Sequence, residues 1–487
     1  MKRIAFPAGS KLFRWLAIFI LLGTTTSILK AAPSTLPVYG GTLRVQIHGR
    51  IATIDPRQWP AGSEHTAAVE RVAPLVFDRL VRLDDHGAPQ PALATSWQYD
   101  AQSKRWQFLL RKGVKFSDGA PLTPEAAALA LQQLLGNAFD VSATSDSVVI
   151  QADHPLPDFP VQLATGRYFI FQTADDGSLT GTGPFHVAEW ASGETPAKLI
   201  LTANESCWAG RPFVDKIELT MGVDAQQQSN AIAFGQSDVV ELPASQVRRA
   251  AQRGVRTVSS DPVELFALQF DMTRSGVQDV RVRQAISLAI DRSSIADVIL
   301  QRQGVAARGL LPNWVSGYAH LFPISMDLPR AKELLTATGR EVSHPAPLAL
   351  IYDSGDEEAR AVADRVAVNL KEAGIAVQVS AQPAAGKILP ADLRLLRRGI
   401  AAPDSGMALA EVLNSFGEGP ADLGTLEQIY AAEHAPIDLF RIIPLVHVTE
   451  SYGLSPQVRD WMAPRWGGWR LEDVWLGPAQ ATAGATQ

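Results

Sequence analysis

Cysteine is almost missing from the sequence: Cys207 is the only one among 487 residues. A disulfide within the chain, a C-x-x-C redox pair and a cysteine-rich zinc site are therefore excluded. A chain of this length buries about three quarters of its unfolded surface, so it can fold without such staples. At about 150 residues per domain, the length predicts roughly three domain-sized units.

An excess of positive charge is also missing. The 44 Lys and Arg residues are outnumbered by 50 Asp and Glu residues, which leaves a net charge of −6. Nucleic-acid-binding domains usually carry a basic stripe, so we expect no nucleic-acid partner.

Sequence motifs for common catalytic chemistry are absent as well. There is no G-x-x-x-x-G-K-[ST] phosphate loop, no G-x-S-x-G elbow and no H-E-x-x-H helix. The nine His residues include no pair at metal-ligand spacing. We therefore predict a protein that is not an enzyme and has no catalytic residues, cofactor or metal, although a catalytic site assembled from distant residues stays open.

The first 32 residues have the features of a secretory signal. They contain no acid, and Trp15 to Leu22 is an unbroken apolar run of eight residues, well short of the roughly 20 that a spanning helix needs. The segment carries five basic residues, so its removal leaves −11: Lys2, Arg3, Lys11, Arg14 and Lys30. We expect a periplasmic or extracytoplasmic protein. Because Lys30 is unusual near a cleavage site, an uncleaved membrane anchor that extends to Leu29 is the alternative.

Two stretches follow a strand–helix–strand pattern. Apolar residues alternate in each strand and recur at helical spacing in each helix, with Asp224 as a helix cap and Gly235 and Gly374 as stops. The expected elements are 217–221, 225–234 and 238–242, then 348–352, 359–370 and 375–379. Such units pair in parallel through right-handed crossovers, so the pattern predicts an α/β fold with two separate lobes.

Several blocks occur in the same order as in a known family. They include GGTLRV from Gly40, the Asp55-Pro56 turn, FLLRKGVKFSDGAPLTPEAA from Phe108, GTGPFHVAEW from Gly181 and DVRVRQAISLAIDRSSI from Asp279. On these blocks the chain resembles the extracellular solute-binding proteins of family 5, the peptide- and nickel-type receptors of ABC importers. Most matched positions are interpreted as scaffold, with Gly113 and Gly119 in turns and with Arg283 and Asp291 tying helix ends together.

The resemblance implies a two-lobed, periplasmic-binding-protein-like clamp of class II type with a subdomain inserted in lobe I. Lobe I would comprise 40–55, 178–267 and 445–480, a shortened subdomain Ib would comprise 56–177, and lobe II would comprise 268–444. Hinge closure would bury a ligand between the lobes. The expected partners are a small solute and a membrane permease with a separate ATPase subunit, and we expect a monomer.

Four residues are ligand-binding candidates through the resemblance. Trp314 and Tyr318 lie in a stretch that approaches the ligand cleft in the family, and Trp59 follows the Asp-Pro turn. Asp404 corresponds loosely to the family Asp that pairs with a peptide amine; its alternative role is to cap a turn. Aromatic side chains give a binding site large contact area at low entropic cost.

Three further features leave alternatives open. Arg397 and Arg398 either face an acidic ligand or, as we prefer, face solvent. Four C-terminal tryptophans either pack the tail on lobe I or form a partner surface: Trp461, Trp466, Trp469 and Trp475. Peptides are the default cargo, with a metal chelate, haem or an oligosaccharide as alternatives and a hydrolytic or sensory protein as a further one. A mature charge of −11 favours a neutral or cationic cargo over an anionic one.

Overall fold

A computed structural model describes residues 36–478, with short gaps. The gaps are 60–65, 85, 157, 175, 192, 194–195, 319–321, 323, 340–345, 384–386, 401, 403, 420–422 and 464–467. The expected signal at 1–32 and Trp466 therefore lie outside the described residues. None of the helices described there combines the length and the apolar character that crossing a membrane requires.

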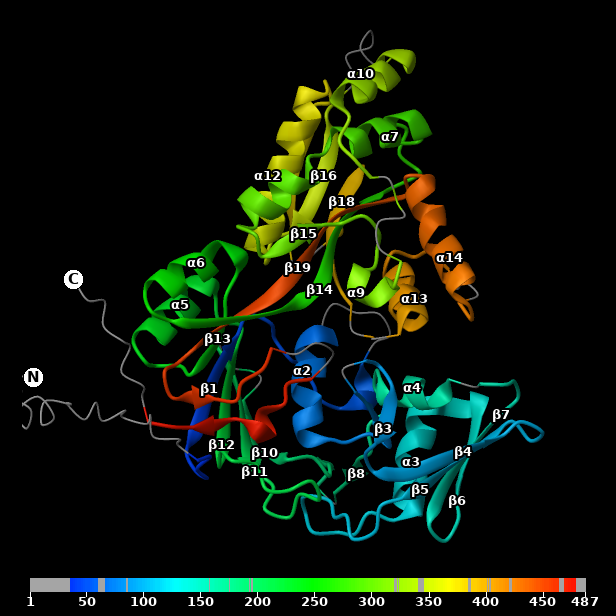
Figure 1. The fold of residues 1–487 in the computed structure, drawn as a ribbon, viewed down its shortest axis with the longest axis vertical. Coiled ribbons are helices and arrows are strands. Elements are labelled where there is room, and N and C mark those ends of the chain that lie inside the picture. The colour runs from blue at the N-terminus through cyan, green and yellow to red at the C-terminus, as the bar shows by residue number, and fades with distance from the viewer. Residues whose placement is uncertain are drawn as a thin grey trace, which may run out of the picture. The chain divides into compact units, whose positions relative to one another are not determined.

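One sheet of 11 strands runs through the molecule (Figure 1). Its order is β10 (Phe185–Ala191), β11 (Ala197–Ala203), β12 (Lys216–Met221), β1 (Thr42–Ile47), β13 (Val239–Glu241), β19 (Ile442–Leu454), β14 (Arg256–Phe270), β18 (Leu393–Gly399), β16 (Leu348–Asp353) and β17 (Val377–Gln382), with β15 (Gly304–Ala306) also paired to β19. We call β10–β13 with β1 the β1 half-sheet, and β16–β18 the β16 half-sheet.

Both predicted strand–helix–strand units are confirmed. β1 lies between β12 and β13 and is parallel to both, and α5 (Ala225–Ala233) connects them with Asp224 as its N-cap. β16 and β17 are parallel and are connected by α12 (Glu357–Glu372). The α/β fold class follows, with one unit in each half-sheet.

Two long antiparallel strands join the half-sheets. β14 and β19 pair from Arg256 opposite Leu454 to Gln269 opposite Ile442. One end of β19 pairs with β13, and one end of β14 pairs with β18. The ladder is irregular around Pro262, as expected because proline lacks the N–H that a ladder needs.

The second half of β14 has side chains in two cores, because alternate side chains point to opposite sides of a strand. Phe266, Leu268 and Phe270 enter a core with α7 (Val280–Ala289), α10 (Leu328–Ala337) and α12. Leu265 and Ala267 enter a second core with α9 (Asn313–Ser316), α13 (Ser405–Ser415) and α14 (Leu426–Asp438). The crossover strand therefore positions helices on both sides of the β16 half-sheet.

The β1 half-sheet has its own core, which includes α2 (Thr66–Val76) and the C-terminal tail. Tyr452, Trp461 and Trp469 pack there with ring centroids 5.3 to 6.3 Å apart, and Trp475 is also buried. Packing of the tail is thus confirmed for the three described tryptophans.

A smaller sheet forms a third core. Its order is β4 (Ala94–Asp100), β5 (Arg105–Leu110), β7 (Ser147–Ala152) and β6 (Phe139–Ala143), covered by α3 (Pro124–Leu135), with α4 (Phe159–Ala164) in the same core. These elements fall inside the range expected for subdomain Ib. The division of the chain into lobes stays a prediction.

Arg283 ties helix ends together, as the sequence predicts. Its guanidinium, only 5% exposed as a residue, donates to the carbonyls of Val277, Gln278, Leu439 and Phe440 at 2.7 to 3.0 Å. Asp291 caps α8 (Arg292–Ser294) by accepting from the Ser294 amide.

The glycines of the GTGPF block permit a close backbone approach to the end of α2. Gly183 N donates to Val76 O at 3.0 Å. A Cβ at Gly183 would lie 2.7 Å from that oxygen, and a Cβ at Gly181 only 2.0 Å from it. The block therefore reflects packing.

We predict that Gly183→Ala destabilises the fold by about 3 kcal/mol or more, because backbone must move to admit the methyl group. Gly193→Ala is the matched control, since its Cβ would meet nothing within 4 Å. Urea denaturation compares the two variants; equal free energies of unfolding would contradict the packing explanation.

Candidate functional site

Trp314 is held against the crossover strand. Its indole Nε1 donates to the Pro262 carbonyl at 2.9 Å, at the irregularity of the β14–β19 ladder. The side chain is partly buried beside the core that contains α9 and α13. Trp314 therefore links α9 to the connection between the half-sheets.

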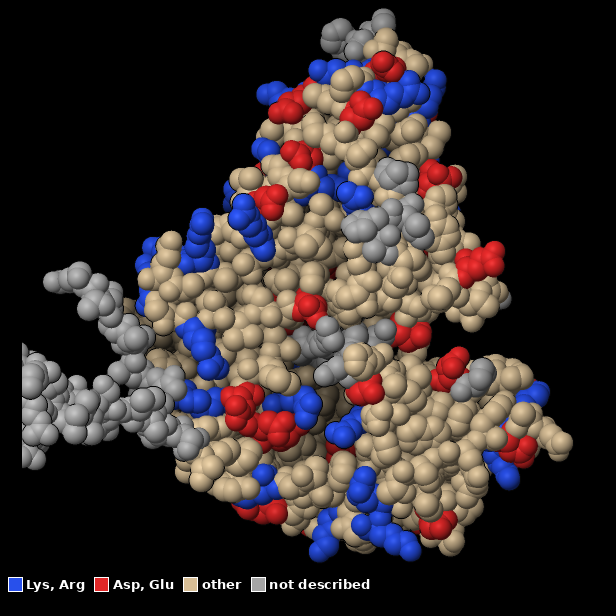
Figure 2. Space-filling view, in the orientation of Figure 1, with Lys and Arg blue, Asp and Glu red and all other residues tan. Residues whose placement is uncertain are grey.

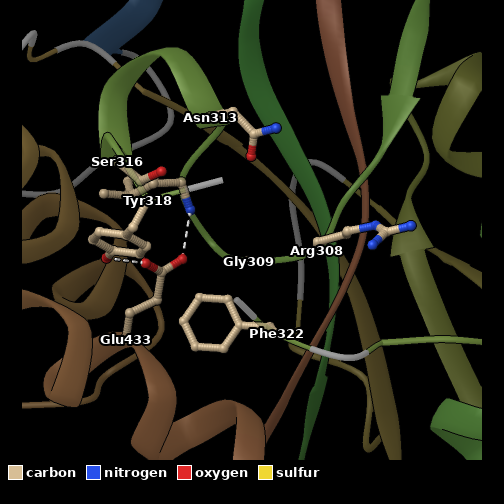
Figure 3. Close-up of a pocket in the computed structure, with 8 residues that line it drawn as sticks. Arg308, Gly309, Asn313, Ser316, Tyr318, Phe322 and Glu433 are labelled. Atoms are coloured by element: carbon tan, nitrogen blue, oxygen red, sulfur yellow. Dashed lines mark hydrogen bonds between the residues drawn. The ribbon is translucent and has the colours of Figure 1, made fainter. Parts of the chain in front are cut away.

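Tyr318 points to Glu433 on α14, inside a small pocket (Figure 3). Glu433 accepts hydrogen bonds from the Tyr318 hydroxyl and from the Leu310 and Leu311 amides. A Cβ at Gly309 would lie 2.5 Å from Glu433 Oε1, so glycine lets the loop close over the carboxylate. About 190 Å³ of empty space, partly open to solvent, is lined by Arg308, Gly309, Leu311, Asn313, Ser316, Tyr318, Phe322 and Glu433.

This pocket is built around a buried acid. Glu433 has no exposed surface, and burial raises its pKa although the hydrogen bonds from Tyr318, Leu311 and Leu310 act in the opposite direction. Burial and the neighbouring Glu433 also raise the pKa of Tyr318. Both groups are engaged with each other, so the pair fixes the loop from 308 to 318.

Asp404 begins a helix. Its Oδ1 accepts from the Met407 amide at 2.9 Å, which makes Asp404 the N-cap of α13. The geometry thus confirms the capping role, and the Asp404 side chain is exposed. A ligand contact for Asp404 stays a prediction.

Trp59 lies apart from these three residues. It packs edge-on against Phe169, with ring centroids 5.7 Å apart, beside the core of the β1 half-sheet. Its indole nitrogen is buried and finds no hydrogen-bond partner among the described residues. Trp314, Tyr318 and the helix that Asp404 caps share one core, and Trp59 adjoins another.

Arg397 is engaged by acids of the protein itself, and 29% of its side chain is exposed. Its guanidinium is paired with Glu264 of β14 and with Asp356 and Glu358 at the start of α12, so it does not face solvent alone. The Cζ atom of Arg398 lies 5.8 Å from the centroid of the Phe416 ring. The sequence holds one signal for this network, because charged residues stand inside strands whose other residues are typical of buried strands.

A second arginine continues the network on the β1 side. Arg71 of α2 pairs with Glu241 of β13 and Glu450 of β19. The Arg71 side chain is only 12% exposed. With Arg397, the two arginines hold carboxylates on both crossover strands, and sequence reasoning did not identify any of these pairs.

Two further carboxylates lie near the network. Burial raises the pKa of Glu70 on α2 to about 7, although Arg79 and Arg71 oppose the shift. Glu411 on α13 reaches solvent, yet desolvation by the surrounding protein raises its pKa to about 7, and the charge of Glu70 adds to the rise. Neither has a hydrogen-bond partner within the described part of the chain.

Neither the surface charges nor the residue types that bind metals indicate a further site among the described residues. Lys and Arg side chains are interspersed with Asp and Glu on the face drawn in Figure 2. Over the residues that the structure describes, no group of three His, Cys, Asp or Glu could hold a metal ion.

We predict that Tyr318→Phe lowers the free energy of unfolding by about 1–3 kcal/mol, because Glu433 loses a donor in a buried site. Tyr39→Phe is the control, since Tyr39 is 60% exposed. If urea denaturation shows a loss of unfolding free energy no greater than that of the control, the hydrogen bond between Tyr318 and Glu433 does not stabilise the fold.

The raised pKa of Glu70 predicts a pH-dependent stability. The stability that protonated Glu70 contributes is fully present below the unfolded pKa of about 4.5 and is lost as pH rises through about 7. The free energy of unfolding of Glu70→Gln, relative to that of the wild type, should therefore be greater at pH 8 than at pH 5, as measured by denaturation at both pH values. A pH-independent difference would refute the assigned environment, with exposed Glu372→Gln as control.

The comparisons with known proteins agree with one another. The family model for the middle part of the bacterial extracellular solute-binding proteins, family 5, matches residues 88–426. A probable D,D-dipeptide-binding periplasmic protein of Escherichia coli is 24% identical over 75% of this chain and 74% of its own length. The nickel-binding periplasmic protein of the same bacterium is 26% identical over 63% of this chain and 65% of its own length.

Solved structures show the same fold. The murein tripeptide binding protein of Escherichia coli has a TM-score of 0.75 at 20% identity and covers 91% of this chain and 99% of its own. The NikA protein of Staphylococcus aureus, in complex with Ni(L-His)2, has a TM-score of 0.75 at 16% identity and covers 90% of this chain and 100% of its own. The expected periplasmic-binding-protein-like fold is thereby confirmed.

Proposed function

Because the chain belongs to the bacterial extracellular solute-binding proteins of family 5, it is a substrate-binding protein of the kind that serves ABC importers, and we propose that it captures small peptides or peptide-like solutes. The observation that carries the proposal is the family match over 88–426, on a fold shared with peptide-binding and nickel-binding relatives.

The architecture supports a clamp. Each half-sheet has its own core, and two strands, β14 and β19, connect them. We propose that the β1 half-sheet belongs to lobe I, that residues 56–177 form subdomain Ib, and that 268–444 form lobe II. Hinge bending at two connecting strands would enclose a solute between the lobes.

A neutral or cationic cargo fits the available charges better than an anionic one. Glu70 and Glu411 carry carboxylates without hydrogen-bond partners in the described chain, on helices whose charges influence each other. A ligand ammonium removed from water needs an acidic partner. We propose that Glu411 supplies this charge, with Trp314 and Trp59 as aromatic contacts and exposed Asp404 as a second acidic contact, whereas Tyr318 acts through the loop that it fixes.

The remaining features of the proposal follow the relatives. They are periplasmic proteins by name, and we propose export by the N-terminal segment followed by delivery of the solute to a membrane permease with a separate ATPase subunit. We propose a monomer that binds without turnover of its cargo.

The test begins with the solute that the protein carries when it is purified from its native source. Native mass spectrometry should reveal a retained small solute that is released on denaturation. Isothermal titration with a diverse pool of di- to pentapeptides should then give saturable binding. Failure of every peptide in the pool to bind or to raise the melting temperature would rule out a peptide cargo.

A metal chelate is the second candidate cargo, because a nickel-binding relative and the structure with Ni(L-His)2 share the family or fold. Retention of a metal together with a small organic chelator would favour it. Turnover of a retained compound would instead support the hydrolytic alternative.

For the cationic site, we predict that Glu411→Gln weakens the binding of trilysine about tenfold, equivalent to about 1.4 kcal/mol for one charged contact. The wild type should bind trilysine more tightly at pH 8 than at pH 5.5, because its carboxylate is charged at the higher pH, and the variant should lose this dependence. Glu372→Gln is the exposed control. Equal titrations for all three proteins would remove Glu411 from the site.

A further inference from the structure

Helix α6 (Ala244–Gln252) begins without a cap of its own. Its N-cap residue is Pro243, which has no side-chain hydrogen bond to the helix. The first amides of a helix need acceptors, and a carboxylate at this end is favourable because the helix dipole is positive there. The acceptor here comes from another part of the chain.

Glu358 supplies that acceptor. Its Oε1 accepts from Ala244 N at 2.5 Å, and the two residues are 114 positions apart in the sequence. α6 follows β13 in the β1 half-sheet, whereas Glu358 lies in the first turn of α12, beside β16. The side chain is 9% exposed, so this bond joins the two parts of the molecule in a largely dry environment.

Arg397 holds Glu358 in place. Its Nη1 lies 2.8 Å from Glu358 Oε2, and the same guanidinium pairs with Asp356 and with Glu264 on the crossover strand. Glu358 thus has one oxygen for the α6 amide and the other for the arginine. A buried carboxylate is tolerated when it is paired and hydrogen-bonded in this way.

A second contact lies close along the chain. His48 Nε2 is 2.9 Å from the Gly355 carbonyl, and the His48 amide donates to Glu241 Oε2 at 2.6 Å. His48 follows β1, and Gly355 precedes α12. The turn before α12 therefore contacts the carboxyl end of β1 as well as the start of α6.

We propose that Glu358 is a latch between the two half-sheets, which caps α6 across the connection and stabilises the relative orientation in which these contacts form. Rotation of one half-sheet about β14 and β19 must break the bonds to Ala244 and His48. The pairs of Arg71 with Glu450 and of Arg397 with Glu264 join each side to a crossover strand and can persist during that movement.

Glu357 provides a matched control in the same helical turn. It carries the same charge one residue earlier, but its side chain is exposed. Glu357→Ala therefore removes an equal charge from the start of α12 without affecting the latch. Likewise, His86→Ala is the control for His48→Ala, since His86 is exposed in a turn.

The test uses the full mature chain without solute, so it is independent of the proposed cargo. Spin labels at Gln252 and Lys371, exposed ends of α6 and α12, in a Cys207→Ser background report the separation of the helices by pulsed dipolar spectroscopy. Hydrogen exchange of the first-turn amides of α6 reports the cap itself. Circular dichroism confirms that each variant is folded.

We expect Glu358→Ala to shift or broaden the distance distribution and to speed exchange at the start of α6 about fivefold, as loss of a cap worth about 1 kcal/mol implies. Glu357→Ala should match the wild type. If Glu358→Ala does not fold, Glu358→Gln and His48→Ala decide, with smaller changes in the same direction. Unchanged distances in every folded variant would overturn the latch, even if exchange at α6 increased.

Discussion

The pairing of Arg397 with Glu264 on β14 is the interaction on which the connection between the two halves depends. β14 and β19 carry carboxylates at a position where the strands are largely buried, and buried charges must find partners of opposite sign. Arg397 also pairs with Glu358 of α12, and Arg71 of α2 also pairs with Glu241 of β13. The connecting strands are therefore fixed by charge as well as by the hydrogen bonds of the sheet.

This arrangement has a consequence for the way the protein holds a solute. Each half has its own core, and Ala244 of α6 also packs in the core of the β16 half-sheet. Movement between the halves therefore costs the contacts that cross the connection, such as that between Glu358 and Ala244. A family scaffold built in this way can conserve its core packing while the residues near the solute change between relatives that bind different cargo.

Local patterns in the sequence predicted the parts of the fold that depend on neighbours in the chain. Alternation, caps such as Asp224 and stops such as Gly374 identified both strand–helix–strand units. The ordered blocks identified the family, and packing explains them, as the Gly183 approach to Val76 illustrates. Burial of the C-terminal tryptophans also followed from their apolar character.

The candidate site was less accessible from the sequence because its contacts join residues far apart. Tyr318 bonds to Glu433, 115 positions away, and Arg397 meets Glu264 at a separation of 133. A charged residue in a strand indicates a partner but does not say which one, so Arg397 was assigned to solvent. Ligand contacts depend further on side-chain directions that no local pattern specifies.

The most direct test of the clamp is a crystal structure of the protein with the solute it carries from its native source. We expect electron density for one small solute between the two half-sheets. This solute should contact residues of 268–444 and also residues of either 56–177 or the β1 half-sheet. Density confined to the pocket beside Tyr318, or to the outer surface of one half, would contradict the clamp.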